Sequence, residues 1–266
     1  MAQRAESRVD HRVFYDRIAR RPDTRAHFDA MLHQDRRGHL APYCWNAARF
    51  FGDVDLTGKH VLEIGSGRGL TSVFMGLLGA ARVVSMEPGL AGSRPGVLSA
   101  QQERVETLGL QQVVTLIDAD FNTWDPAGDR FDVVISQASI NHLYESPHHA
   151  LHHQDTFERY QQIWQRMHSL LAPDGVCCVS DACRYGFFPM TRRLGFRRPW
   201  NTKHTTINWK IHQNPGTWRQ IARASGFSAV EIEYPLPYSL RHFGPVVANP
   251  VSNFFLRAAF SLRAFE

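Results

Sequence analysis

Apolar residues recur at two different periods along the chain, and the period changes near residue 55. In the first part they return every three or four residues, which is typical of amphipathic helices, in segments 13–20, 24–35 and 41–51. After residue 60 they gather into short continuous runs that predict buried strands, at 60–64, 81–86, 113–118, 131–136 and 175–181. Helical patterns separate these runs, at 70–79, 99–110 and 150–171.

Strands that alternate with helices at this spacing indicate βαβ units, and therefore an α/β fold with a mostly parallel sheet covered by helices. The segment 215–227 predicts a further helix, with a proline near its start and a glycine at its end. Two segments, 229–234 and 256–265, alternate apolar with polar residues, and we expect them to pair antiparallel at the sheet edge. The pattern thus predicts a doubly wound, seven-stranded sheet with an antiparallel last strand.

The composition is that of an ordinary globular protein. Hydrophobic residues make up 43% and charged residues 21%, so there is enough apolar surface to build a core. No segment approaches the run of about 18 apolar residues that a membrane span needs. The charged N-terminus also lacks the apolar region of a secretory signal. We therefore expect a soluble, cytoplasmic protein without a membrane span.

The basic excess is mild, with 30 Lys and Arg against 25 Asp and Glu. The densest basic cluster, at 191–200, has interleaved aromatic residues, but one short cluster favours a solvated or anion-facing loop over an RNA site. We expect no nucleic-acid partner. The cysteines lack the spacing of a disulfide framework or a zinc site, and we expect reduced, structural thiols at Cys44, Cys177, Cys178 and Cys183.

The segment VLEIGSGRGL, at 61–70, carries the clearest chemical signal. A strand enters a glycine turn and then a helix, so the backbone can approach a ligand closely beside unpaired N–H groups. A dinucleotide-binding turn needs its third glycine where Leu70 stands. The pattern here is E-x-G-x-G-x-G, and it resembles the first motif of class I S-adenosylmethionine-dependent methyltransferases of the small-molecule, natural-product type. The resemblance implies a Rossmann-like fold.

This resemblance implies a cofactor site for S-adenosylmethionine, with S-adenosylhomocysteine as product. Glu87 comes 22 residues after Gly65 and is followed by Pro88, where the family places an acid on the ribose hydroxyls. Asp120 resembles the family's acid for the adenine amine, with Phe121 packing on the ring, and Asp118 competes with Asp120 for that role. The turn itself contributes Glu63, Gly65, Ser66 and Gly67.

Two further parts of the cofactor site rest on the same resemblance. The end of the fourth strand, at Ser136 and Gln137, is expected to face the methionine moiety and the substrate. Tyr15 lies in a segment that looks like the amphipathic first helix of many small-molecule methyltransferases, where a tyrosine reaches the cofactor's carboxylate. An ordinary packed aromatic remains the alternative for Tyr15.

Histidines supply the candidate proton acceptors. His142 lies six residues beyond the end of the fourth strand, and an imidazole in general can accept a proton near neutral pH, so we predict that His142 takes a hydroxyl proton as the methyl transfers. A histidine hydrogen-bonded within its own loop is the alternative. Three roles stay open for Asp181: orienting His142, binding the substrate or capping the next turn. His204 and His212 are further base candidates.

The spacing of four other histidines gives two pairs four residues apart, as metal ligands on a helix would be. No third ligand is evident, so we expect a polar helix face and no metal site. The pairs are His148 with His152 and His149 with His153.

These observations predict one methyltransferase domain acting on a small-molecule acceptor, by O-methylation of a natural-product or sugar intermediate with histidine-assisted deprotonation. N- or C-methylation is the alternative, followed by an RNA or protein methyltransferase and an NAD-dependent oxidoreductase. The apolar tail could be an edge strand or part of a homodimer contact. The expected parts are a helical cap at 1–55, a cofactor-binding core at 56–182, a lid or substrate insertion at 183–214 and a C-terminal helix with an edge hairpin at 215–266.

Overall fold

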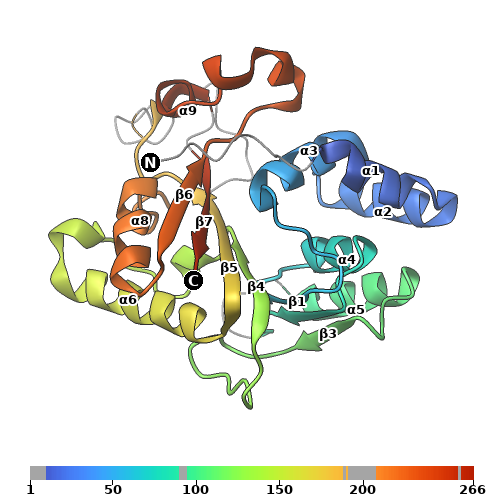
Figure 1. Ribbon diagram of the computed structural model, residues 1–266, viewed down its shortest axis with the longest axis horizontal. Helices are drawn as coiled ribbons and strands as arrows, with labels where there is room; N and C mark the ends of the chain where they lie inside the picture. The colour runs from blue at the N-terminus through green and yellow to red at the C-terminus, as the bar shows by residue number, and fades with distance from the viewer. Residues whose placement is uncertain (1–9, 90–94, 188–189, 191–207, 257–258) are drawn as a thin grey trace. The chain divides into compact units, whose positions relative to one another are not determined.

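The computed structural model describes residues 10–89, 95–187, 190, 208–256 and 259–266 (Figure 1). The chain divides into two compact units, which we call the N-terminal unit (Met1–Asp120) and the C-terminal unit (Phe121–Glu266). The strands form a seven-stranded sheet in the order β3-β2-β1-β4-β5-β7-β6. This confirms the predicted α/β fold. No helix in the described ranges is long and apolar enough to cross a membrane.

The N-terminal unit begins with the three predicted amphipathic helices, α1 (His11–Ala19), α2 (Pro22–Gln34) and α3 (Leu40–Phe51). They form one group in Figure 1. Their apolar faces meet around Phe74, whose ring centroid lies 5.8 Å from that of Phe28 and 5.9 Å from that of Phe14. All three rings are buried. Aromatic packing of this kind holds the helices onto the unit's core.

The rest of the N-terminal unit is a βαβαβ run, as the pattern predicted. Its elements are β1 (His60–Ile64), α4 (Leu70–Leu77), β2 (Arg82–Met86), α5 (Val97–Thr107) and β3 (Val114–Ile117). The three strands pair in parallel, with Leu62 opposite Val84 and Val84 opposite Thr115. Because both faces of a parallel sheet are covered, strand residues such as Val61 and Val83 are fully buried.

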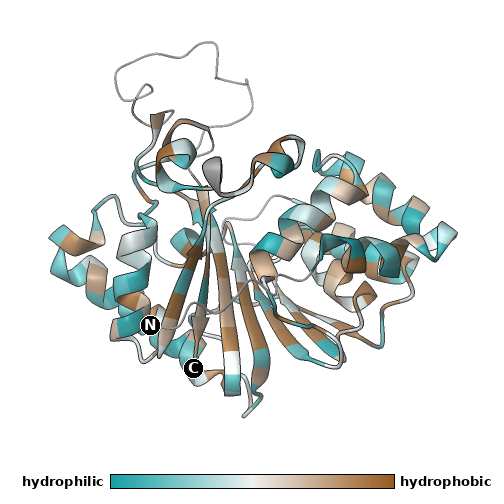
Figure 2. Ribbon diagram, turned by 45° about the horizontal axis from the view of Figure 1, so that its top comes forward, coloured by the Kyte–Doolittle hydropathy of each residue, from teal (hydrophilic) through white to brown (hydrophobic). Residues whose placement is uncertain are grey.

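The C-terminal unit holds the mixed part of the sheet. Strands β4 (Phe131–Gln137) and β5 (Leu171–Ala182) are parallel, whereas β7 (Ala259–Phe265) runs antiparallel to both β5 and β6 (Ala229–Glu233). In Figure 2 most strand residues have the colours of hydrophobic residues, whereas hydrophilic and hydrophobic residues alternate along the helices. The remaining elements are η1 (Ile140–His142), η2 (Ala150–His152), α6 (Gln154–Ser169), α8 (Pro215–Ala224), η3 (Tyr238–Val246) and α9 (Pro250–Leu256).

Large aromatic side chains join α6 to α8 beside this sheet. The ring of Trp218 lies 4.8 Å from that of Tyr160 and 6.1 Å from that of Trp164, centroid to centroid. All three residues have no exposed surface. The helix predicted at 215–227 is therefore present as α8, and its buried face docks it on α6.

Three predicted boundaries are wrong. The helix expected at 150–171 begins at Gln154, because a short 3-10 turn precedes it and the His153 side chain accepts from the N–H of Thr156. Strand β5 starts at Leu171, four residues before the apolar run at 175–181. The strand expected from 256 begins at Ala259, and residue 256 is instead the last residue of α9. Most of the insertion expected at 183–214, including His204 and the basic cluster at 191–200, lies outside the described residues.

The four cysteines are free and buried, as expected for structural thiols. Burial raises the pKa of the Cys44 thiol to about 12, and burial also raises that of Cys183 to about 12. These thiols are therefore protonated and unreactive at neutral pH.

Candidate functional site

The glycine turn between β1 and α4 adopts a left-handed backbone at Gly67 and Gly69, with φ values of 55° and 73°. At Gly69 there is a second constraint, because a Cβ there would lie 2.3 Å from Cγ of Gln101. At Gly67 no described atom outside the glycine and its two chain neighbours lies within 4 Å of the position of a Cβ. The turn is thus pressed against α5 at one glycine and open at the other.

Helix α5 holds this turn with two side chains that the sequence pattern did not single out. Gln101 is fully buried, and its Nε2 donates to the carbonyl of Gly67 at 2.9 Å and to the hydroxyl of Ser66. Arg104 donates to the carbonyl of Arg68 at 3.0 Å. A polar residue on a helix gives the same sequence pattern whether it faces solvent or a neighbouring turn, so neither contact had a signal.

Arg104 also ties the turn to the end of α2. Its two terminal nitrogens each lie 2.7 Å from a carboxylate oxygen of Asp35, in the bidentate geometry that suits guanidinium and carboxylate. Arg68, from the turn itself, adds a contact of 3.0 Å to the same carboxylate. One acid from the N-terminal helices therefore anchors both the turn and α5.

Glu87 lies directly at the turn, and its contact with the ribose hydroxyls stays a prediction. Its Oε2 accepts the N–H of Gly67 at 2.8 Å, and the residue is 8% exposed. Pro88 follows and is half-buried. The N–H of the next residue, Gly89, donates to Asp118 at 2.7 Å. The structure thus brings Glu87 to the turn and Asp118 to the loop that follows Glu87.

The candidate pair Asp120 and Phe121 spans the boundary between the two units. Asp120 is exposed. The Phe121 ring is only 2% exposed, and the guanidinium carbon of Arg166 lies 5.2 Å from its centroid. Arg166 also donates to the carbonyl of Phe121 at 2.8 Å. Phe121 is therefore fixed within the C-terminal unit, and its contact with an adenine ring stays a prediction.

Glu63 sits beneath the turn in a polar cluster. It is 2% exposed, its carboxyl accepts the hydroxyl of Ser72, and that hydroxyl lies 2.6 Å from the hydroxyl of Ser85. Burial is the main cause that raises the pKa of Glu63 to about 8; the hydrogen bond from Ser72 opposes this rise, and the nearby charge of Glu87 adds to it. Glu63 is therefore mostly protonated at neutral pH.

Tyr15 makes no hydrogen bond in the described part of the chain, and the guanidinium carbon of Arg25 lies 5.8 Å from its ring centroid. The tyrosine that reaches the surroundings of the turn is Tyr43, on α3. It forms a side-chain hydrogen bond with Thr71, and burial raises its pKa. Nothing in the sequence indicated this contact with Thr71 beyond the presence of an aromatic residue on a helix face.

The end of β4 makes a sharp turn in the C-terminal unit. Ser136 is buried and its hydroxyl lies 2.7 Å from that of Ser139. Ala138 has a left-handed φ of 57° and donates its N–H to the carbonyl of Ser180 at 2.7 Å. Gln137 is half-buried at the last position of β4. The turn is thus well fixed, and the contact of Ser136 and Gln137 with the cofactor stays a prediction.

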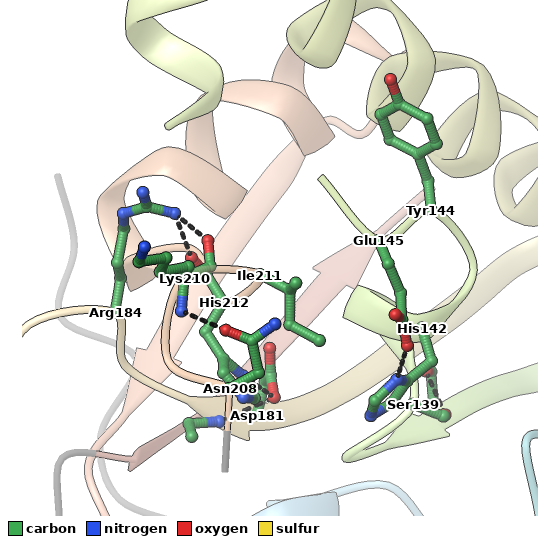
Figure 3. A network of polar contacts seen from close by, with 12 residues as sticks. Ser139, His142, Tyr144, Glu145, Asp181, Arg184, Asn208, Lys210, Ile211 and His212 are labelled. Carbon is green, nitrogen blue, oxygen red and sulfur yellow. Dashed lines mark hydrogen bonds and ion pairs between the residues drawn. The ribbon is translucent and has the colours of Figure 1, made fainter. Parts of the chain in front are cut away.

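Asp181 and His142 do not pair with each other. His142 has a side chain that is 55% exposed, and its Nδ1 lies 2.6 Å from Glu145 (Figure 3). Asp181 has a side chain that is 1% exposed, and its Oδ1 lies 3.0 Å from Nδ1 of His212. The interpretation in which Asp181 orients His142 is therefore wrong. The structure instead brings Asp181 to His212, which the sequence pattern had indicated only as a further candidate.

The four histidines that were expected to pair on one helix face pair differently in the structure. The His148 ring stacks on His153 with centroids 4.2 Å apart, and the His149 ring stacks on His152 at 4.8 Å. Only part of this segment is helical, so the spacing of four does not apply. Within the described ranges, no group of three or more His, Cys, Asp and Glu is placed to hold a metal ion.

Comparisons with known proteins agree with this fold. A family model described as a methyltransferase domain matches residues 33–232. No curated protein matches the chain. Similar solved structures include an S-adenosylmethionine dependent methyltransferase from Mesorhizobium loti, with 16% identity, 80% of this chain and 93% of that chain covered, and a TM-score of 0.53.

Two more structures are similar at comparable levels. A SAM dependent methyltransferase from Aquifex aeolicus has 12% identity, with 96% of this chain and 98% of that chain covered and a TM-score of 0.51. The pyocyanin biosynthetic protein PhzM has 17% identity, with 95% of this chain and 61% of that chain covered and a TM-score of 0.50. These identities show the fold, and the family match extends over most of the chain. The chain therefore belongs to the methyltransferase-domain family, in the class of S-adenosylmethionine-dependent methyltransferases.

Proposed function

We propose that this chain binds S-adenosylmethionine at the glycine turn of the N-terminal unit and transfers its methyl group to a small-molecule acceptor. The observation that carries the proposal is the contact between the Glu87 carboxylate and the N–H of Gly67, at 2.8 Å. It supports a site where an acid for the ribose hydroxyls adjoins a backbone turn. A carboxylate suits a cis-diol because the two hydroxyls offer two donors at matching separation.

The open backbone at Gly67 also supports this proposal. No described atom outside the glycine and its two chain neighbours lies within 4 Å of the position of a Cβ there. Glycine there lets the main chain approach a ligand as closely as van der Waals contact allows. The helix α4 begins directly after the turn, and no side chain of the described residues caps its N-terminus. We also propose cofactor contacts, in the roles that the family resemblance implies, for Gly65, Ser66, Pro88, Asp120, Phe121, Ser136, Gln137 and Tyr15.

When bound, S-adenosylmethionine supplies an electrophilic methyl group on a sulfonium. The work left to the protein is to hold the acceptor in line with that methyl and to exclude water. A base is needed only where the acceptor must lose a proton. We propose an oxygen acceptor on a natural-product or sugar intermediate. N- or C-methylation is the alternative.

The test is calorimetric titration with S-adenosylhomocysteine, with NADH in parallel. The native protein is expected to bind S-adenosylhomocysteine, and Glu87→Ala is expected to lose at least tenfold in affinity. Glu145→Ala is the matched control, because this exposed acid belongs to the other unit and pairs with His142. Binding of NADH alone would overturn the proposal, and so would equal affinities of the native protein and Glu87→Ala.

A further inference from the structure

Asp181 and His212 form a buried carboxylate–imidazole pair at the end of β5. The Oδ1 of Asp181 accepts from Nδ1 of His212 at 3.0 Å and from the N–H of Ala182 at 2.8 Å. Because an ionised carboxylate only accepts, the ring proton must sit on Nδ1. The lone pair of the neutral ring is then on Nε2, and none of the described residues hydrogen-bonds to that atom.

The main chain around His212 is fixed by buried polar side chains. Arg184 is buried, and its guanidinium donates to the carbonyls of Lys210, of His212 at 3.3 Å and of Pro147 at 2.7 Å. Figure 3 shows the Arg184 guanidinium next to Lys210 and His212. On the other side of His212, the fully buried Gln213 donates to the carbonyl of His148 at 2.9 Å. The imidazole is therefore held in place before any ligand arrives, as a catalytic group requires.

Two polar atoms beside the ring lack partners. Oδ2 of Asp181 and Nε1 of Trp209 are both buried without a hydrogen bond from any residue that the structure describes. The Trp209 ring lies 5.8 Å from that of His212, centroid to centroid. Buried unpaired groups cost free energy, and a ligand that pairs with them recovers it. The indole also offers a flat apolar surface, which suits an aromatic ligand.

We infer that Asp181, Trp209 and His212 form the acceptor site and that the acceptor is a phenol, with His212 as its proton acceptor and Asp181 as a positioning residue. This inference rests on the proposed function. The O–H bond of the phenol breaks and its proton goes to Nε2 of His212. The phenol oxygen forms a bond to the methyl group, and the carbon–sulfur bond of the donor breaks with its electron pair left on sulfur. The charge of Asp181 stabilises the imidazolium.

His142 does not fit this role as well. Its side chain is 55% exposed and pairs with Glu145, which is 57% exposed. An exposed pair is held weakly, because solvent screens its charges and its side chains stay mobile. His212, by contrast, is 10% exposed and held from both sides.

The test uses a series of phenols of graded acidity, with release of S-adenosylhomocysteine as the readout. His212→Ala is expected to lower kcat/KM by about 10²–10⁴-fold for weakly acidic phenols, the usual effect of a general base. For a nitrophenol that is already ionised at the assay pH, the loss should be less than tenfold. Asp181→Asn should show the same dependence on acidity. His242→Ala is the matched control, an exposed histidine of the same unit.

Each outcome of these measurements supports or overturns either the proposed function or the inference. If S-adenosylhomocysteine does not bind the native protein, the proposed function fails. If it binds but no phenol is methylated, or His212→Ala lowers turnover equally for every phenol, the inference is overturned and the proposed function stands. An acidity-dependent loss in His142→Ala alone would also overturn it. Nitrogen-15 spectra of the native protein give an independent check: the Nδ1–H form of His212 is expected, and the Nε2–H form would overturn the inference.

Discussion

Glu63 is an acid whose surroundings favour its neutral form. Burial raises its pKa from an ordinary value of 4.5 to about 8. Between these two values, the folded protein retains a proton that the unfolded chain has lost. The free energy of unfolding therefore falls as the pH rises through this interval. The contribution is fully present below pH 4.5 and is lost above about pH 8.

The matched variant is Glu63→Gln, which keeps an oxygen that accepts from Ser72 but cannot ionise. We expect its free energy of unfolding to be less dependent on pH than that of the native protein between pH 4.5 and about 8. Urea denaturation at several pH values in this interval measures the difference. Identical slopes for the two proteins would contradict the buried, neutral carboxyl.

Gly69 carries both a backbone and a packing constraint. Its φ of 73° costs an alanine about 1–2 kcal/mol. The added methyl would also meet Gln101, and such overpacking costs about 1–3 kcal/mol more. Gly58→Ala is the control, because Gly58 has a φ of 72° but open space around its Cβ position among the described residues. Urea denaturation should show Gly69→Ala to be the less stable of the two, and equal stabilities would contradict the clash.

At the scale of elements, α5 supports the turn through one buried ion pair. Arg104 is 3% exposed and Asp35 is 13% exposed, so removal of either leaves a charge poorly solvated. We expect Asp35→Asn to lower the free energy of unfolding by about 3–5 kcal/mol. Arg68→Gln removes a side chain that is 44% exposed and contacts the same carboxylate, and should cost at most about 1 kcal/mol. Similar losses in the two variants, measured by urea denaturation, would contradict this account.

The sequence predicted the elements well where one physical signal dominates. Short apolar runs located β1, β2, β3 and β4 to within a residue or so, because strands in a sheet covered by helices are mostly apolar. The boundaries of α6 and β5 were missed, since local capping at His153 and pairing of Leu171 with Phe131 decide them. Neither signal is visible in the apolar pattern.

The site was predictable only where a compact motif carries it. The turn with Glu87 follows from glycines at fixed spacing in one βαβ unit. The pair of Asp181 with His212 joins residues 31 positions apart, and Gln101 reaches the turn over 34 positions. Contacts at such separations depend on how elements pack, which one sequence does not reveal.

At the scale of the whole molecule, the cysteines report on both units. Cys44 lies in the N-terminal unit, whereas Cys177, Cys178 and Cys183 lie in the C-terminal unit, and all four are buried. We expect a thiol reagent to label none of them rapidly in the native protein and all four in urea. Mass spectrometry counts the labels, and Cys44→Ser should carry three. Rapid labelling under native conditions would contradict the burial of these side chains.

The contact between Gly69 and Gln101 also limits how the chain can evolve. A side chain larger than hydrogen at position 69 would occupy the place of the Gln101 side chain, at 2.3 Å from its Cγ. A shorter side chain at position 101 would leave space for a side chain at position 69. It would also remove the amide group that donates to the Gly67 carbonyl and the Ser66 hydroxyl. The residues at positions 69 and 101 are therefore expected to change together. Among related proteins, we expect a residue other than glycine at 69 to appear only together with a smaller residue at 101 and a different anchor for the turn.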